Sequence, residues 1–179
     1  AFDNLATGHR WAVKWGPLEI GDVRDAGLLE ALMVRYRVTA VFHFAALSLV
    51  GRSAEMPFDY YDVNVGGALA LSLAMRGSGL RKLVFSSTCA VYGVPQHLPI
   101  AEDAPTLPVN VYGRTKLAAE NLFCDLARAD VLDVALLRYF NAAGADSEGE
   151  IGETRDPESH LIPLAIRAAL AHSSAARRV

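Results

Sequence analysis

The sequence predicts an α/β fold with a parallel sheet, and three features predict it. Apolar segments of strand length alternate with longer segments whose apolar residues recur every three or four positions. The strand segments are continuous apolar runs, which are typical of parallel strands covered by crossover helices. The chain has 179 residues, 52% of them hydrophobic, which is enough for one domain with a substantial core.

Strands and helices follow one another along the chain. Residues 18–20 form a short strand candidate, and residues 25–37 have the apolar spacing of a helix. The runs at 39–45 and 83–86 predict strands that are buried on both faces. The remaining expected elements are a helix at 57–78, a helix at 111–128, a strand at 134–139 and a helix at 161–171.

The composition excludes several classes of function. A net charge of −3 argues against a nucleic-acid-binding surface, which is normally basic. The two cysteines, Cys89 and Cys124, make no disulfide framework and have no Cys or His partners at metal-ligand spacing. No run approaches 18 apolar residues, so no membrane span is expected. We therefore expect a cytoplasmic protein with no metal, no nucleic-acid partner and no membrane partner.

One pair of residues points to proton chemistry. Tyr112 and Lys116 are four residues apart within the predicted helix 111–128, so the phenol and the ammonium share one helix face. A nearby cation favours the phenolate and lowers the pKa of a tyrosine from its usual value near 10. The pattern is short enough to occur by chance, and an ordinary surface pair is the alternative interpretation.

Small and polar residues follow several predicted strands, at the sheet edge where open α/β folds bind ligands. The strand at 83–86 continues into Ser87 and Thr88, 24 residues before Tyr112, and a hydroxyl there can bond the oxygen that Tyr112 deprotonates. Other strand ends carry Phe44, Ala45 and Ala46, then Tyr139 and Asn141, then Asp3 and Asn4, and then Asp22 and Val23.

Several longer segments can be compared with known families. They are DNLATG at 3–8, GDV at 21–23, HFAALSLVG at 43–51, YYDVNVGG at 60–67, FSSTCAVYG at 85–93, YGRTK at 112–116, LLRYFNAAGA at 136–145 and HLIP at 160–163. With these segments in this order, the chain resembles the extended short-chain dehydrogenase/reductase family and, within it, the nucleotide-sugar epimerases.

The resemblance implies a Rossmann-like doubly wound sheet with tightly held NAD, and interconversion of UDP-glucose and UDP-galactose through a 4-keto sugar. Tyr112 would take the proton of the sugar 4-hydroxyl, Lys116 would lower the Tyr112 pKa and hold the nicotinamide ribose, and Thr88 would bond the same sugar oxygen. The implied cofactor-binding residues are Asp3, Asn4, Asp22, Val23, Phe44, Ala45, Ala46, Asn64, Ser86, Tyr112, Lys116 and Tyr139. The implied substrate-binding residues are Thr88, Tyr112, Asn141, His160 and Leu161.

Two positions bear on the reaction type. Dehydratases of the family place Asp-Glu after the threonine of this strand end, whereas here the positions are Cys89 and Ala90. We therefore expect oxidation and reduction at one carbon without elimination of water. Epimerases of UDP-pentoses or UDP-N-acetylhexosamines share these motifs and remain the alternative.

Four residues also have a purely structural interpretation. Thr88 can cap the strand end, Asn64 can be a satisfied polar residue of its helix, and His160 can serve only as the first residue of a helix. His43, within a buried strand, is expected to be a core residue rather than a ligand.

The resemblance also implies the extent of the chain and its assembly. The glycine-rich phosphate fingerprint lies about 20 residues before the ribose acid, so it would precede residue 1 if Asp3 is that acid. We expect residues 1–179 to be a partial NAD-binding domain without its first βαβ unit, with residues 160–179 entering a substrate domain. The strand at 18–20 would then have no neighbour, and the chain as given would bind NAD weakly or not at all. An inactive fragment or interaction module is the alternative. The helices at 57–78 and 111–128 would pair across a homodimer.

Overall fold

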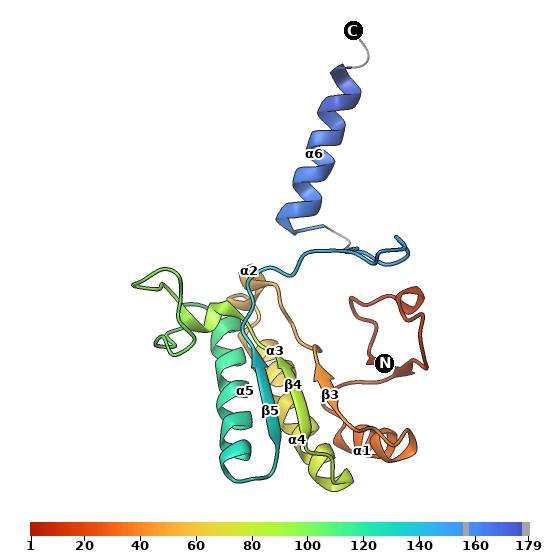
Figure 1. Ribbon diagram of the computed structural model, residues 1–179, viewed down its shortest axis with the longest axis vertical. Helices are drawn as coiled ribbons and strands as arrows, with labels where there is room; N and C mark the ends of the chain where they lie inside the picture. Colours follow the sequence, from red (N-terminus) through yellow and green to blue (C-terminus); the bar gives the residue numbers. More distant parts are fainter. Residues whose placement is uncertain (156–157, 177–179) are drawn as a thin grey trace. The chain divides into compact units, whose positions relative to one another are not determined.

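The computed structural model describes residues 1–155 and 158–176, and these form two compact units. The sheet unit comprises residues 1–4 and 16–140. The second unit comprises residues 5–15 and the described residues from Asn141 onward. Figure 1 shows the order of the elements, which alternates between strand and helix as the sequence predicts.

Three parallel strands form the main sheet of the sheet unit. They are β3 (Val41–His43), β4 (Lys82–Ser86) and β5 (Asp133–Leu137), in the order β3-β4-β5. Phe85 of β4 lies opposite His43 on one side and Leu136 on the other. Because all three strands run in the same direction, their carboxyl ends meet at one edge, which is where the sequence places Thr88 and Tyr139.

A second, two-stranded sheet lies at the start of the chain. It pairs β1 (Phe2–Asp3) with β2 (Glu19–Ile20) in parallel, with Phe2 opposite Glu19. The expectation that the strand at 18–20 has no neighbour is therefore wrong, because Phe2 and Asp3 supply enough backbone to pair with it. The two sheets are separate.

The helices have the bounds that their capping residues set. Helix α1 (Ala26–Arg35) begins where the Asp25 side chain accepts a bond from the Leu28 amide at 2.9 Å. Helix α5 (Val111–Arg128) begins where Asn110 accepts from the Gly113 amide at 2.7 Å. Shorter helical segments are η1 (Arg10–Ala12), α2 (Val50–Ser53) and η3 (Cys89–Tyr92), and α6 (Leu161–Ala176) belongs to the second unit.

The predicted helix at 57–78 is continuous but not uniform. It consists of α3 (Pro57–Tyr60), a π-helical segment η2 (Tyr61–Gly66) and α4 (Gly67–Ser78). It ends at Gly79, whose φ of 72° is the left-handed conformation that glycine adopts without strain. The wider π turn carries the buried Asn64, and such turns occur frequently at functional sites.

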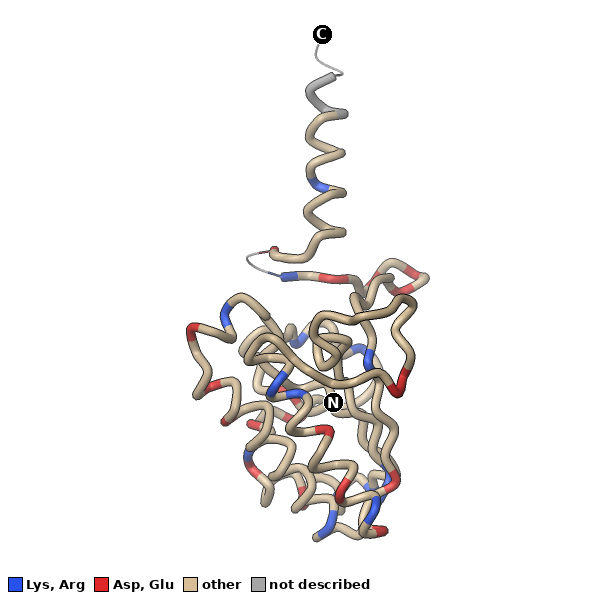
Figure 2. Tube along the Cα trace, turned by 90° about the vertical axis from the view of Figure 1, so that its left-hand side faces the viewer, with Lys and Arg blue, Asp and Glu red and all other residues tan. Residues whose placement is uncertain are grey.

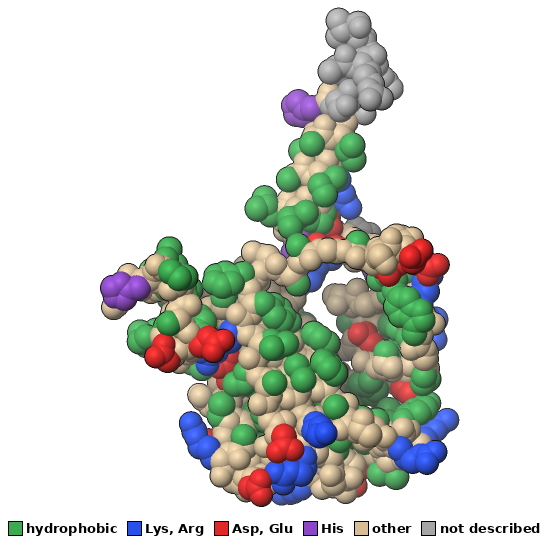
Figure 3. Space-filling model, in the orientation of Figure 1, with side chains coloured by type: hydrophobic (Ala, Val, Ile, Leu, Met, Phe, Trp, Pro, Cys, Tyr) green, Lys and Arg blue, Asp and Glu red, His purple; other side chains and the backbone are tan. Residues whose placement is uncertain are grey.

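The core lies between the sheet and helices α1, α4 and α5. Phe85 and Phe123 are 1% and 0% exposed, with ring centroids 4.9 Å apart in an edge-to-face arrangement. The expected burial of β3 on both faces is wrong, because Phe42 is 64% exposed while His43 is buried. The helices pack on the face that carries His43 and Phe85. Figure 3 shows hydrophobic side chains gathered over the opposite face.

Two further features of the structure are the distribution of charged residues and the apolar character of the helices. Figure 2 shows basic and acidic residues interspersed along the sheet unit rather than gathered in one patch. Within residues 1–155 and 158–176, no helix combines the length and apolar character needed to cross a membrane.

We expect Phe123→Ala to lower the free energy of unfolding by about 3–5 kcal/mol, because it removes a fully buried ring and leaves a cavity. Phe58→Ala is the matched control, since Phe58 is 81% exposed, and we expect it to change stability by less than about 0.5 kcal/mol. Urea unfolding followed by circular dichroism measures both. Equal losses in the two variants would contradict this assignment of the core.

Candidate active site

The predicted reaction centre is assembled from the carboxyl end of β4 and the first turns of α5. Gly113 allows this close approach, because a Cβ there would lie 2.7 Å from the carbonyl oxygen of Ala90 in η3. Tyr112 thereby comes close to Thr88, whose hydroxyl lowers the pKa of the phenol. The structure brings these two predicted residues together.

The protonation of Tyr112 differs from the expectation. The expected lowering of its pKa by Lys116 is not found: burial raises the pKa of Tyr112 above 10, and the hydrogen bond with Thr88 opposes this effect. The Thr88 hydroxyl oxygen accepts from the Ala90 amide at 3.1 Å. Its own proton is then free to be donated to the Tyr112 oxygen, which favours the phenolate.

Lys116 lies in a buried position at the same end of the sheet. It is 3% exposed, its Nζ donates to the Ser86 carbonyl oxygen at 2.8 Å, and it lies 4.7 Å from the centroid of the Phe85 ring. Burial lowers the pKa of Lys116 from 10.5 to about 8, and the Glu120 carboxylate partly offsets this effect. The ammonium therefore titrates much closer to neutrality than an exposed lysine does.

Two predicted cofactor residues meet beside Lys116. The hydroxyl groups of Ser86 and Tyr139 are hydrogen bonded to each other across the ends of β4 and β5. The Tyr139 carbonyl oxygen also accepts from the Cys89 amide at 3.1 Å. These contacts extend the ladder between the two strands beyond the sheet and line its carboxyl edge with hydroxyl groups.

Asn64 is engaged within the chain. Its Oδ1 accepts from the Leu47 amide at 2.8 Å, and its Nδ2 donates to the Leu47 carbonyl at 3.1 Å and to Thr115 Oγ1 at 3.0 Å. Both amide protons are therefore used. Asn64 holds the loop after β3 against α5, which agrees with the structural interpretation of this residue.

A second group of predicted residues lies at the ends of β1 and β2. The Asp22 carboxylate accepts from Arg24 Nε at 2.7 Å and from Nη2 at 2.6 Å, and Asn4 also bonds to it. Arg24, the largest cause, holds the pKa of Asp22 at about 2. The Asp3 carbonyl oxygen accepts from the Gly21 amide, and Val23 is buried. Asp22 is thus a fixed carboxylate at a strand end.

The segment after β3 offers an open, largely apolar surface. Phe44 is 61% exposed, its ring stacks on Phe42 at 6.5 Å, and the small residues Ala45 and Ala46 follow. Small side chains leave the backbone accessible to a flat ligand. The hydroxyl groups and the carboxylate can form hydrogen bonds with a dinucleotide, and this apolar segment can lie against it. The residues present therefore fit NAD.

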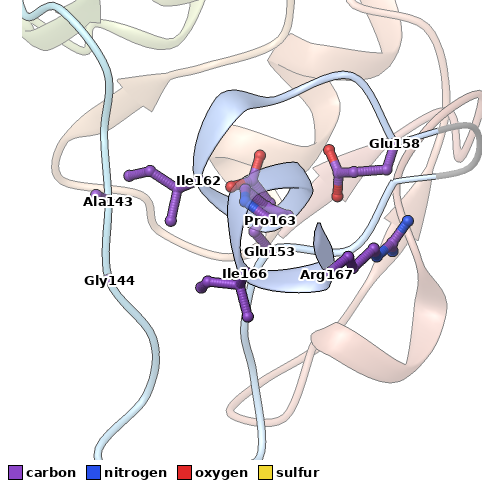
Figure 4. Close-up of a pocket in the computed structure, with 8 residues that line it drawn as sticks. All are labelled: Ala143, Gly144, Glu153, Glu158, Ile162, Pro163, Ile166 and Arg167. Atoms are coloured by element: carbon purple, nitrogen blue, oxygen red, sulfur yellow. The ribbon is translucent and has the colours of Figure 1, made fainter. Parts of the chain in front are cut away.

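The other predicted substrate residues, Asn141, His160 and Leu161, belong to the second unit and are exposed. His160 forms an ion pair with Glu153 when its ring is protonated. Figure 4 shows the pocket of this unit, with two glutamates and Arg167 near apolar side chains. Its lining residues are Ala143, Gly144, Glu153, Glu158, Ile162, Pro163, Ile166 and Arg167. Assignment of the three predicted residues to a substrate site stays a prediction.

The sequence interpretation missed a buried ion pair behind the reaction centre. Glu120 is 1% exposed, and both its oxygens accept from Arg138, which follows β5. Ser87 donates its hydroxyl proton to Glu120. A signal was present, because Glu120 follows Tyr112 and Lys116 at the same spacing of four residues, but a glutamate on a helix is usually a solvated residue.

Comparison with known proteins gives consistent matches. The model of the NAD dependent epimerase/dehydratase family matches residues 1–176. A UDP-glucose 4-epimerase of Rhizobium leguminosarum bv. trifolii is 49% identical over 169 residues, which are 94% of this chain and 52% of that protein. The chain spans about half the length of the curated relatives it matches.

Solved structures give the same result. UDP-glucose 4-epimerase from Brucella ovis in complex with NAD superimposes with a TM-score of 0.92 at 50% identity, over 96% of this chain and 53% of that one. The enzyme from Bifidobacterium longum in complex with NAD+ and UDP superimposes with a TM-score of 0.82 at 37% identity, over 86% of this chain and 49% of that one. The fold of these proteins is the Rossmann-like α/β fold that the sequence predicts.

We expect the Lys116 amine to titrate near pH 8, because burial disfavours its charged form. Folding is opposed by this lysine below pH 8, because burial disfavours its charged form. The penalty is relieved as the pH rises from 8 toward 10.5, where the folded state binds fewer protons than the unfolded state. NMR of ¹³Cε-labelled lysine measures this titration, and Lys116→Arg identifies the Lys116 signal. Titration of Lys116 above pH 10 would contradict the assignment.

Proposed function

The chain belongs to the NAD dependent epimerase/dehydratase family, and from that premise we propose that the protein interconverts UDP-glucose and UDP-galactose with NAD as its cofactor. The observation that carries the proposal is that Thr88, Tyr112 and Lys116 lie close together at the carboxyl edge of the parallel sheet. Relatives at 45–49% identity named UDP-glucose 4-epimerase support the choice of reaction.

The predicted residues divide the work of holding NAD between the strand ends. Lys116, Ser86 and Tyr139 would contact the nicotinamide and its ribose, because their polar groups meet beside Tyr112. The adenosine would be held at the ends of β1 and β2 by Asp3, Asn4, Asp22 and Val23. The open segment Phe44, Ala45 and Ala46 would lie along the dinucleotide, with Asn64 fixing the loop that follows it.

The chain's own residues supply the proton steps. Tyr112, as phenolate, accepts the proton of the sugar 4-hydroxyl and later returns it to the 4-keto oxygen. Thr88 bonds the same oxygen and stabilises the phenolate, and the Lys116 ammonium supplies positive charge nearby. NAD, when bound, would take the hydride from carbon 4 and give it back to the other face of the sugar. The full burial of Lys116 and the partial burial of Tyr112 strengthen these electrostatic effects, because they limit the access of water.

The residues after Thr88 favour epimerisation over elimination of water. Cys89 and Ala90 occupy the positions of η3 where an additional acid and base would be needed. The alanine has no titratable group, so proton transfer to a departing hydroxide has no donor at that position. The reaction is thereby restricted to oxidation and reduction at one carbon.

The remaining parts of the proposal concern the role of each segment. Residues 1–179 form part of an NAD-binding domain, and the segment from residue 160 begins a domain that binds the sugar nucleotide. Asn141, His160 and Leu161 would then contact the substrate.

The protein acts in the cytoplasm, where UDP-sugars are its partners, and it has no nucleic-acid or membrane partner. The net charge of −3 and the interspersed basic and acidic residues along the chain (Figure 2) support the absence of a nucleic-acid partner.

A homodimer is the assembly that helices α4 and α5 support. One side of α4 packs in the core through Leu71 and Met75, while Leu69 and Leu73 are 49% and 43% exposed. A helix that is apolar all round is normally buried on all sides. The exposed leucines continue into a groove whose lining is Leu69, Ser72, Leu73, Arg76, Leu122, Leu126 and Val131. A second copy of this helix pair would cover the groove and form a four-helix bundle.

We expect the protein expressed from its complete reading frame to convert UDP-glucose into UDP-galactose, and Tyr112→Phe to lower kcat by about 10³-fold because the general base is lost. Coupled detection of both sugar nucleotides measures the reaction. Tyr61→Phe, at a 45% exposed tyrosine, is the matched control and should keep wild-type turnover. A 4,6-dehydrated product or no turnover would count against the proposed reaction. Near-normal activity of Tyr112→Phe would remove Tyr112 from the base role.

We expect Leu73→Glu to convert the dimer into a monomer, because a charge would be buried without a partner in the proposed bundle. Light scattering coupled to size-exclusion chromatography measures the mass. Val34→Glu places the same charge at a 61% exposed position of α1 and should leave the dimer intact. A monomeric wild-type protein, or a dimeric Leu73→Glu variant, would disprove this interface.

A further inference from the structure

We propose that Glu120 and Arg138 form a buried positioning pair for the reaction centre: they hold the tip of β4 against α5 so that Thr88, Tyr112 and Lys116 stay in one geometry. The proposal rests on the proposed function for its meaning in catalysis. The contacts that support it are those of Glu120 with Arg138 and with Ser87, and none of these residues takes part in the proposed proton transfer.

The tip of β4 is joined to one face of α5 by consecutive contacts. The Ser86 carbonyl oxygen accepts from Lys116, the Ser87 hydroxyl donates to Glu120, and Thr88 lies close enough to Tyr112 to lower its pKa. The three partners on α5 are spaced by four residues, so they lie along one side of the helix. Of the three contacts, only the one between Ser87 and Glu120 joins two residues to which the proposed function gives no role.

Arg138 makes the burial of the Glu120 carboxylate tolerable. Its Nε lies 3.0 Å from Oε1 and its Nη2 lies 2.6 Å from Oε2, a two-pronged geometry that a lysine could not supply. The remaining nitrogen, Nη1, donates to the Tyr92 hydroxyl at 3.0 Å and to the Glu102 carbonyl at 3.2 Å. The pair therefore ties together α5, the end of β5 and the segment that follows the β4 tip.

The same carboxylate also acts on Lys116, one helical turn away. Its negative charge favours the ammonium form and raises the pKa of Lys116 against the effect of burial. The other titratable groups near Lys116 are Tyr112 on α5, His43 on β3 and Tyr139 after β5. Burial, with a smaller effect of Lys116, lowers the pKa of His43 to about 3, so His43 stays neutral near pH 7 and adds no charge. Glu120 is thus the anionic group that keeps Lys116 charged.

Four proteins expressed from the complete reading frame test the proposal: wild type, Glu120→Gln, Ser87→Ala and the control Asp125→Asn. Glu120→Gln keeps the side-chain volume and removes the charge. Ser87→Ala keeps the ion pair and removes only the link to the strand tip. Asp125→Asn neutralises an exposed carboxylate of the same helix, which pairs with Arg128 outside this network. Each is measured for kcat, KM, thermal unfolding and the NMR titration of Lys116.

We expect Glu120→Gln to lower kcat by about 10- to 100-fold with KM changed less than about threefold, because a displaced reaction centre costs rate more than binding. The Lys116 signal should titrate at lower pH than in the wild type, and the basic side of the kcat–pH profile should move in the same direction. Ser87→Ala should lower kcat by about tenfold. Asp125→Asn should match the wild type in every measurement.

Two results would overturn the proposal. One is a Glu120→Gln variant that unfolds at lower temperature yet keeps the wild-type kcat, pH profile and Lys116 titration, because the pair would then be merely structural. The other, which decides the matter if Glu120→Gln does not fold, is wild-type kcat in Ser87→Ala. If the wild type itself does not epimerise UDP-glucose, the proposed function fails on its own. A Lys116 titration unchanged in Glu120→Gln would still overturn the pair, and a shift to lower pH would support it.

Discussion

The burial of charged groups at one end of the sheet is the constraint on which the rest of the site depends. Lys116 and Glu120 are 3% and 1% exposed, and a charge in such a position costs free energy unless a partner or a hydrogen bond compensates it. Lys116 is compensated by the Ser86 carbonyl oxygen and Glu120 by Arg138. These compensating contacts join β4, α5 and the end of β5. The requirement to satisfy the charges and the requirement to bring Thr88 to Tyr112 are therefore met by the same backbone arrangement.

Much of the fold was predictable from periodicity, and the errors have physical causes. The helix at 111–128 has the bounds that were expected, because Asn110 caps it and its apolar residues keep a helical spacing. The strand ends were placed less well, since β3 covers only Val41–His43 of the run at 39–45. A continuous apolar run does not show which face a helix will cover, and Phe42 is exposed although it lies in such a run. The π turn at Tyr61–Gly66 has no sequence signal that separates it from an α-helix.

The candidate site was predictable where a spacing or a resemblance identified residues, and not where long-range packing decides. The spacing of Tyr112 and Lys116 placed both on one helix face, and the strand end placed Thr88 within reach of Tyr112. The direction of the Tyr112 pKa was mistaken because burial raises it by more than the Thr88 hydroxyl lowers it. Asn64 was predicted as a cofactor residue, but its amide is used by Leu47 and Thr115. Those contacts span the fold and leave no local pattern.

The net charge of the buried cluster explains why Glu120 needs a partner of its own. A carboxylate beside Lys116 without a second cation would neutralise the ammonium, and the phenolate of Tyr112 would then face no net positive charge. Arg138 engages both oxygens of Glu120, so Lys116, Glu120 and Arg138 together carry one positive charge. Formation of the phenolate brings the cluster to neutrality, which is the arrangement of lowest electrostatic cost in a medium of low dielectric constant. The positive charge that favours proton removal from the sugar is thus maintained by a carboxylate and its guanidinium partner acting together, not by the lysine alone.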